Sequence, residues 1–398
     1  MAKILYICGG RSFYSSHLNR KIEEVANSWR NAGHDVKHIC GGDILSPPPQ
    51  EHTYGSQPRR PRWYADQQLL KFVEVSISEH RDVVHDQKML EFLEANVSNW
   101  KPDIVWERSS RLHSAGLHFA KALSIPYVLE WKDNLVNYNF SLRRHQALKL
   151  EVEKIERADH LVVESNILKK QLCRENNIDG GKVVVAHNAV DAAQFLPNLG
   201  SRKEFRESLK IDDDTVLVGY LGSYAFYHDT SLLILAAELT KKTHPHLNIK
   251  FLMVGAGKDF EKCYSLASEK NLLGDYMVMI SGVPKTDVPK VLSALDIAVL
   301  PGSTDIICPI KVQEYMASEL PSVVPNYACN REVLADMRTG VLFEPGNVVD
   351  LAEKIECLAR DRELRKSIGQ AAQKDVIERF SWQATWVKAV ESIISSHS

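Results

Sequence analysis

The sequence predicts an α/β protein made of two consecutive parallel-sheet domains. Short apolar runs alternate with longer helical patterns, and most runs stop at a glycine or proline turn. The runs are nearly continuous rather than alternating, as expected for strands buried on both faces of a sheet. A chain of 398 residues also exceeds one comfortable core. The pattern pauses at Phe195 to Ser201, which predicts domains at 1–195 and 196–380 and a terminal helix at 381–398.

The first domain opens with a strand–turn–helix–strand unit. Lys3 to Cys8 is a strand that stops at Gly9-Gly10, Ser16 caps a helix of about His17 to Asn31, and Asp35 to Cys40 is the next strand. The right-handed crossover rule makes these strands parallel neighbours. Further strands are expected at Asp103 to Trp106, Tyr127 to Trp131, His160 to Val163 and Lys182 to Ala186, with helices at Gln67 to Ser98, His113 to Leu123, Arg143 to Arg157 and Asn166 to Glu175.

The second domain repeats the alternation. Its strands are expected at Val216 to Leu221, Ile249 to Val254, Met277 to Ile280, Ile297 to Leu300, Ser322 to Val324 and Val341 to Phe343, each followed by a helical stretch. Two helices, about Leu364 to Arg379 and Ser381 to Ser396, close the chain, and Ser381 is a credible cap between them.

Composition excludes several classes of protein. A formal net charge of −2 gives no electrostatic footprint for nucleic acid. The longest basic run, Arg59 to Arg62, could contact anionic lipid or an anionic acceptor, but a solvated loop is favoured. Seven cysteines without a CxxC pair favour reduced thiols, and no apolar run approaches a membrane span. We expect a cytoplasmic protein, or one peripheral at the inner membrane face.

The stretch from Pro301 to Pro325 reads as strand end, loop, short helix and next strand. Pro309 stands where a helix can begin, and Lys311 and Glu314 then share one face of that helix. A lysine beside a helix N-terminus, at the carboxyl edge of a parallel sheet, is suited to bind a phosphate. An ordinary helix with solvated charges explains the same residues equally well.

Other polar residues follow predicted strands at the same type of edge. In the second domain Gly222 ends the first strand, and Ser223 and His228 could donate hydrogen bonds to a phosphate, although a structural turn is favoured on chemistry alone. In the first domain the edge carries Gly9, Gly10, Arg11, Glu107, Arg108, Glu130, Trp131, Lys132 and Asp133. Glu130, Lys132 and Asp133 could move a proton or orient a hydroxyl, or form a surface ion pair. No HExxH or GxSxG pattern supports a zinc site or a hydrolase.

Several of these motifs together resemble glycosyltransferase family 4. The carriers are the GS-x4-HD loop from Gly222, SGVPKTDVP, CPIKVQEYMASELPSVV and FSWQATW. The resemblance implies a GT-B fold, in which two Rossmann-like domains face a cleft, and retaining, nucleotide-sugar-dependent chemistry. It also implies that the final helix returns to the first domain.

The resemblance assigns roles residue by residue. Glu314 matches the second glutamate of an E-x7-E motif and would bind the donor ribose, while Lys311 and the helix start would bind the diphosphate. The implied donor-binding set is Gly222, Ser223, His228, Val283, Pro309, Ile310, Lys311 and Glu314. Gly9, Gly10, Arg11 and Glu107 form the acceptor side, and Lys311, Lys132 and Glu130 are the catalytic candidates. No metal and no cofactor beyond the nucleotide-sugar co-substrate are expected.

The predicted function is transfer of a sugar from a nucleotide diphosphate to an acceptor hydroxyl, with retention. Glycan, lipid-linked and small-molecule acceptors all remain open, with polysaccharide biosynthesis as the expected setting. Two alternatives stay open. One is a nucleotide-sugar 2-epimerase. The other is a non-catalytic nucleotide-sugar-binding subunit, because Ile306 stands in place of the first E-x7-E glutamate and Ser223 replaces an arginine.

Overall fold

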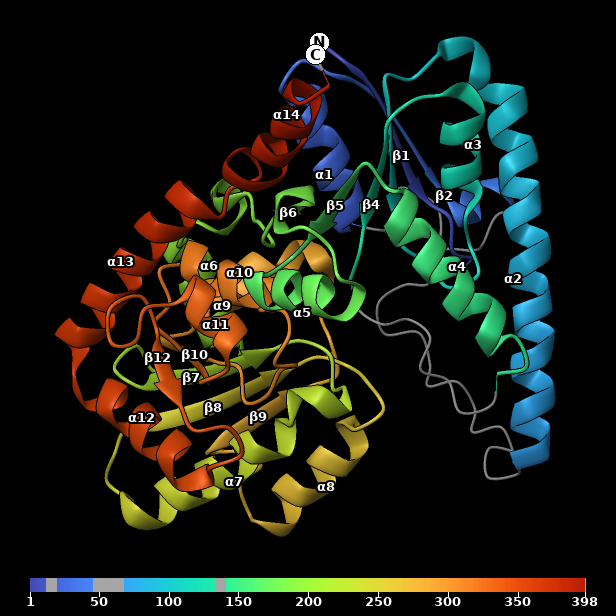
Figure 1. The fold of residues 1–398 in the computed structure, drawn as a ribbon. Helices are drawn as coiled ribbons and strands as arrows, with labels where there is room; N and C mark the ends of the chain where they lie inside the picture. Colours follow the sequence, from blue (N-terminus) through green and yellow to red (C-terminus); the bar gives the residue numbers. More distant parts are fainter. Residues whose placement is uncertain (12–19, 46–67, 133–140, 398) are drawn as a thin grey trace. The chain divides into compact units, whose positions relative to one another are not determined.

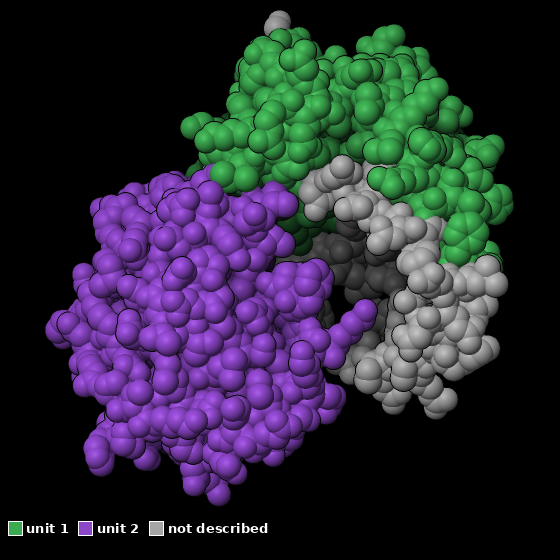
Figure 2. Space-filling view, turned by 60° about the horizontal axis from the view of Figure 1, so that its bottom comes forward, with its two compact units in different colours: residues 1–51, 59–187, 382–398 green, residues 52–58, 188–381 purple. Residues whose placement is uncertain are grey.

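The computed structural model describes residues 1–11, 20–45, 68–132 and 141–397. These residues divide into two compact units, coloured separately in Figure 2. Unit 1 holds the described residues up to His187 together with the C-terminal segment from Trp382, and unit 2 runs from Asn188 to Ser381. The basic run Arg59 to Arg62, the expected helix start at His17 and the candidate Asp133 lie outside the described residues.

Unit 1 is built on a six-stranded parallel sheet in the order β2-β1-β3-β4-β5-β6 (Figure 1). Its strands are β1 Lys3–Cys8, β2 Asp35–Cys40, β3 Ile104–Arg108, β4 Tyr127–Glu130, β5 His160–Val163 and β6 Val183–Val185. Its helices are α1 Arg20–Asn31, α2 Gln68–Asn96, α3 Ala115–Leu123, α4 Arg144–Arg157, α5 Asn166–Asn176 and the late α14 Lys388–Ser395. β1 lies between β2 and β3, so the strand order reverses there.

Unit 2 carries a second six-stranded parallel sheet, in the order β12-β11-β10-β7-β8-β9. Its strands are β7 Val216–Leu221, β8 Ile249–Val254, β9 Met277–Ile280, β10 Ile297–Val299, β11 Ser322–Pro325 and β12 Val341–Phe343. Its helices are α6 Leu199–Ser208, α7 Thr230–Thr243, α8 Phe260–Glu269, α9 Val288–Ala294, α10 Ile310–Ala317, α11 Ala328–Val333, α12 Val348–Arg360 and α13 Arg362–Arg379. Figure 1 shows α7, α8 and α12 on one face of this sheet and α9, α10 and α11 on the other.

The position of β7 decides where a ligand can bind in unit 2. β7 pairs with β8 on one side and with β10 on the other, and all of these strands are parallel. The chain therefore leaves β7 and β10 in opposite directions, and in parallel sheets ligands bind outside the carboxyl ends of the strands at such a point. The loops that follow β7 and β10 carry the motifs singled out in the sequence, from Gly222 to His228 and from Pro301 to Lys311.

The boundary between the units differs from the sequence pattern. The pause at Phe195 to Ser201 is a short 3-10 turn followed by α6, and unit 2 already begins at Asn188. The physical reason is that Val190 and Phe195 are 1% and 2% exposed and pack into the unit 2 core. A Pro, Asn and Gly cluster marks a turn, and here the turn lies inside a domain rather than between two.

The C-terminal segment packs within unit 1. Its first turn is a π-helix, Gln383–Val387, in place of the single regular helix expected from Ser381. The extra residue per turn places Trp386, 0% exposed, against Trp106, with ring centroids 6.1 Å apart. The indole of Trp29 donates to the Trp386 carbonyl at 3.0 Å, and that of Trp386 donates to the His187 carbonyl at 3.0 Å.

Candidate functional site

Helix α10 presents Lys311 at the carboxyl end of β7. Pro309 is the N-cap, with an extended backbone at ψ 142°, and the helix begins at Ile310. Tyr315 lies one turn after Lys311, is 0% exposed, and its hydroxyl donates to the Leu221 carbonyl at 3.3 Å. The helix is therefore fixed to the end of β7, and Lys311 lies beside the loop that starts at Gly222.

The Lys311 ammonium has an enclosed, mostly uncharged environment. Its Nζ lies 3.0 Å from Nε2 of His228, 3.5 Å from the Tyr220 hydroxyl and 5.1 Å from the centre of the Tyr220 ring. Burial lowers the pKa of Lys311 to about 8, and neighbouring Glu314 opposes that shift. A cation in this state gains strongly when an anion arrives, because the anion replaces the solvation that burial removed.

His228 is buried at 4% exposure behind this lysine. Its Nδ1 lies 3.2 Å from the carbonyl oxygen of Gly302, in the loop after β10. Burial first, and then the Lys311 charge, lower the pKa of His228 to about 4, so the ring is neutral at physiological pH. The neutral ring therefore joins the two loops that follow β7 and β10.

The position of the Lys311 side chain requires a glycine at residue 222. A Cβ added there would collide with the Lys311 ammonium and lie 2.9 Å from the Tyr220 hydroxyl. Because no side chain fits, the lysine can cross directly over the backbone of the loop. The absence of a side chain at Gly222 is thus what allows Lys311 to approach the backbone so closely.

The remaining donor-side candidates differ in how far their side chains are exposed. Ser223 is exposed, and its carbonyl accepts a hydrogen bond from the Tyr220 hydroxyl at 2.6 Å. Glu314 and Ile306 are partly buried, as are Pro309 and Ile310 at the helix start. Val283 is partly buried and packs against the unit 2 core in the loop after β9. The structure thus brings Gly222, His228 and Lys311 into direct contact and leaves the ribose and base roles of Glu314 and Val283 as predictions.

In unit 1, Glu130 occupies a closed position. It is 0% exposed. Its Oε2 accepts from the Tyr6 hydroxyl at 2.9 Å and from the Trp106 indole at 3.3 Å, and its Oε1 accepts from Arg108 Nη1 at 2.6 Å. This geometry argues against the expected proton-handling role, because an enclosed carboxylate with three donors cannot reach a substrate. Its structural effect is to hold Arg108 in place.

Glu107 is also interior rather than lining a surface. It is 1% exposed, and its Oε2 accepts from the Tyr127 hydroxyl at 2.6 Å and from the Leu117 backbone N–H at 3.2 Å. Burial raises its pKa to about 7, against a smaller opposite effect of Lys154. The placement at the start of α3 does not fit the acceptor contact expected from the sequence. Strand residues alternate between faces, and Glu107 points toward the helix layer.

Lys132 and the Gly9 turn are placed at the carboxyl edge as expected. Lys132 Nζ lies 3.5 Å from Glu164 Oε1, and its side chain is 29% exposed. Gly9 and Gly10 are buried in the turn after β1. Arg11 forms an ion pair with α2, where its Nε donates to Asp82 Oδ1 at 2.6 Å.

Sequence reasoning missed the residues that position Lys311. Tyr220 contacts Lys311, Gly302 contacts His228, and Tyr315 contacts Leu221 at the end of β7, yet none of the three has a role predicted from the sequence. The spacing of Tyr315, four residues after Lys311, and of Tyr220, two before Gly222, was the available signal. A strand tyrosine or a helix tyrosine is ordinarily part of a core, and only the packing distinguishes these two.

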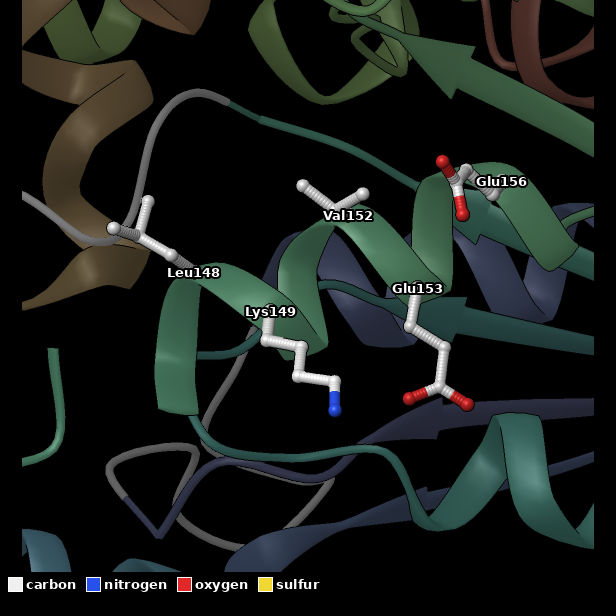
Figure 3. Close-up of a pocket in the computed structure, with 5 residues that line it drawn as sticks. All are labelled: Leu148, Lys149, Val152, Glu153 and Glu156. Carbon is white, nitrogen blue, oxygen red and sulfur yellow. The ribbon is translucent and has the colours of Figure 1, made fainter. Parts of the chain in front are cut away.

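A shallow pocket on α4 contains none of these residues. It is lined by Leu148, Lys149, Val152, Glu153 and Glu156, all from that helix (Figure 3). Within the described ranges, no group of three His, Cys, Asp or Glu side chains could hold a metal ion. None of the described helices combines the length and apolarity needed to cross a bilayer.

Two family models match consecutive parts of the chain. Residues 18–194 match "Glycosyltransferase Family 4", and residues 201–375 match "Glycosyl transferases group 1". The chain belongs to this glycosyltransferase family. The family resemblance read from the motifs is thereby confirmed, and so is the α/β fold with two Rossmann-like parallel sheets.

Individual relatives of this glycosyltransferase are distant. The sulfoquinovosyl transferase SQD2 of Arabidopsis thaliana is 25% identical over 303 residues, which are 74% of this chain and 57% of that enzyme. In three curated relatives the match spans little more than half of the relative's length.

Solved structures extend the likeness over the whole chain. Sucrose-phosphate synthase of Thermosynechococcus elongatus has a TM-score of 0.72 at 16% identity, with 100% of both chains covered. Anabaena HepE, solved with UDP and glucose, has a TM-score of 0.70 at 15% identity, covering 99% of this chain and 100% of that one. At this identity the likeness shows the GT-B fold alone, and the cleft between the domains stays a prediction.

Proposed function

We propose that this glycosyltransferase moves a sugar from a nucleotide diphosphate to an acceptor hydroxyl, with retention at the anomeric carbon and without a metal. The observation that carries the proposal is the Lys311 ammonium, which lies over Gly222 at the strand switch point of unit 2 and contacts His228 and Tyr220. A partly desolvated cation at that point suits the diphosphate of a nucleotide sugar. The UDP bound to Anabaena HepE, a protein of the same fold, is consistent with such a donor.

The reaction needs a cation where negative charge develops. As the bond between the anomeric carbon and the diphosphate oxygen breaks, the electron pair stays on the diphosphate and the sugar becomes oxocarbenium-like. The acceptor oxygen then bonds to the anomeric carbon and releases its proton to the departing phosphate. Lys311 stabilises the leaving group, and its enclosed position strengthens that interaction relative to water.

The two departures from the family pattern increase the demand on Lys311. Ser223 is exposed and brings no charge, and Ile306 brings none at the position eight before Glu314. We therefore assign the cationic role to Lys311 and the ribose contact to Glu314. His228 acts through Lys311, as a positioning residue.

A panel of nucleotide sugars tests the proposal. The expected result is thermal stabilisation by one nucleotide class and transfer to an added hydroxyl acceptor, with the donor's anomeric configuration retained in the NMR spectrum of the product. Conversion of the donor with no acceptor present would instead indicate an epimerase. Stabilisation by the nucleotide without transfer to any glycan, lipid-linked or small-molecule acceptor would indicate a binding subunit.

A further inference from the structure

Three cations and two carboxylates converge at the carboxyl edge of the unit 1 sheet. Lys21 lies at the start of α1, Arg108 ends β3 and Lys132 follows β4. Glu130 ends β4 and Glu164 follows β5. All five belong to unit 1, so their arrangement is independent of where unit 2 lies.

The contacts divide these five side chains into one nearly inaccessible ion pair and a second group whose two lysines are partly exposed. Arg108 and Glu130 face each other at 2.6 Å and are nearly inaccessible, with side chains 7% and 0% exposed. Glu164, with a side chain 3% exposed, shares its Oε1 between Lys21 and Lys132, the latter at 3.5 Å. The side chains of Lys21 and Lys132 are 19% and 29% exposed. Both ammonium groups thus bracket one carboxylate and remain within reach of solvent.

The electrostatic state of Lys21 is determined mainly by its burial. Burial is the largest cause that lowers its pKa to about 8, and the charges of Lys132 and Arg108 lower it further. Glu164 opposes the shift but does not cancel it. The Lys21 ammonium also lies 4.8 Å from the centre of the Trp386 ring, which fixes its position without neutralising it.

We propose that Lys21 and Lys132 form an anion site that binds a phosphate group carried by the acceptor. Ammonium groups from separate elements, gathered at the carboxyl edge of a parallel sheet, suit a compact oxyanion. The assignment of the anion to the acceptor rests on the proposed function, whereas the anion site itself does not. The phosphate belongs either to a soluble phosphorylated polyol or to a lipid headgroup, and the chemistry of recognition is the same.

Calorimetric titration with glycerol 3-phosphate, compared with glycerol at constant ionic strength, tests the site. The measurement is made in the Lys311→Gln protein, so that the lysine of unit 2 cannot account for binding. We expect phosphate binding there, and binding at least about tenfold weaker once Lys132→Gln is added. Lys121→Gln is the matched control, because Lys121 is 30% exposed, pairs with Asp159 at 3.2 Å, and lies at the opposite edge of the same sheet. Adding it should leave the affinity unchanged.

Sedimentation with phosphatidylglycerol vesicles identifies the source of the phosphate. Vesicle binding that Lys132→Gln abolishes indicates a lipid headgroup, and binding of the soluble phosphate alone indicates a soluble acceptor. The proposal is overturned if neither ligand binds, or if Lys21→Gln and Lys132→Gln both bind phosphate like the parent protein. Its failure is separable from failure of the transferase proposal, which is tested by turnover in the Lys311 variants.

Discussion

The Nε2 atom of His228 lies 3.0 Å from the ammonium nitrogen of Lys311. The other ring nitrogen, Nδ1, lies 3.2 Å from the Gly302 carbonyl, which can only accept a hydrogen bond. Nδ1 must therefore carry the proton, and Nε2 accepts from the lysine. The sequence suggested that His228 donates to a phosphate. In this arrangement it has no free proton to donate, and its effect on the donor passes through Lys311.

Replacing Lys311 should remove most of the leaving-group stabilisation. Lys311→Ala is expected to lower kcat by about 100-fold or more, since one positioned cation contributes roughly 3 kcal/mol in the transition state. Steady-state kinetics with the donor identified by the panel measure this, and circular dichroism checks the fold. A turnover within a few-fold of the parent protein would remove Lys311 from the mechanism.

His228 should act as a positioning residue for that cation. His228→Phe keeps a ring of similar shape but has no lone pair, so kcat/KM for the donor should fall about tenfold or more. The lone pair also favours the charged lysine, so the alkaline limb of the pH profile should move to lower pH. Tyr227→Phe, an exposed neighbour in ring contact with His228, is the control. An unmoved limb would leave His228 with a purely structural role.

Donor affinity should depend on pH through Lys311. The pKa of Lys311 is about 8 in the free protein, and a bound diphosphate favours the charged form and raises it. Binding is therefore strongest below pH 8 and weakens by up to about tenfold per pH unit above it, until the bound-state pKa is reached. Titrations of the nucleotide diphosphate between about pH 6.5 and 9.5 measure this. The slope should disappear in Lys311→Gln, which separates Lys311 from other groups that titrate near pH 8.

A methyl group at Gly222 should displace the lysine. In Gly222→Ala the new Cβ would overlap the Lys311 ammonium and approach the Tyr220 hydroxyl to 2.9 Å, so the lysine must leave its position. We expect donor affinity to fall about tenfold or more while the protein still folds, since a flexible side chain can move aside. Isothermal calorimetry with the nucleotide and a melting curve report the two effects. Unchanged affinity would mean that Lys311 binds donor from a different rotamer.

Glu107 should make stability depend on pH. Folding raises its pKa from 4.5 to about 7, so the folded state binds more protons than the unfolded state between these values. Stability from this group is therefore full below about pH 4.5 and is lost as pH rises through 7. Glu107→Gln keeps an oxygen for Tyr127 and Leu117 but no charge. It should gain up to about 3 kcal/mol relative to the parent between pH 5 and pH 8. Chemical denaturation at both pH values measures the difference, and an equal effect at both would contradict the assigned pKa.

Sequence patterns alone predict the fold class, the approximate position of each strand and the loop that carries Lys311. These follow from local properties: the continuous apolar runs of β1 and β7, the turns at Gly9 and Gly222, and the helix start after Pro309. Parallel topology then placed Gly222, His228 and Lys311 at one edge without further information. Unit 2 begins at Asn188, a few residues before the Pro, Asn and Gly cluster. The cluster alone does not locate that boundary, because turn residues look alike inside and between domains.

The chemical role open to each polar residue at that edge depends on packing that sequence patterns do not reveal. Glu130 and Lys132 lie two residues apart in the sequence. Glu130 is enclosed by three hydrogen-bond donors, whereas Lys132 reaches solvent. Packing also decides the role of His228. Its Nδ1 donates to the Gly302 carbonyl, so its Nε2 is left to accept a hydrogen bond from Lys311. Burial and hydrogen-bond partners come from residues distant in the chain, and they set both the charge and the reach of a side chain.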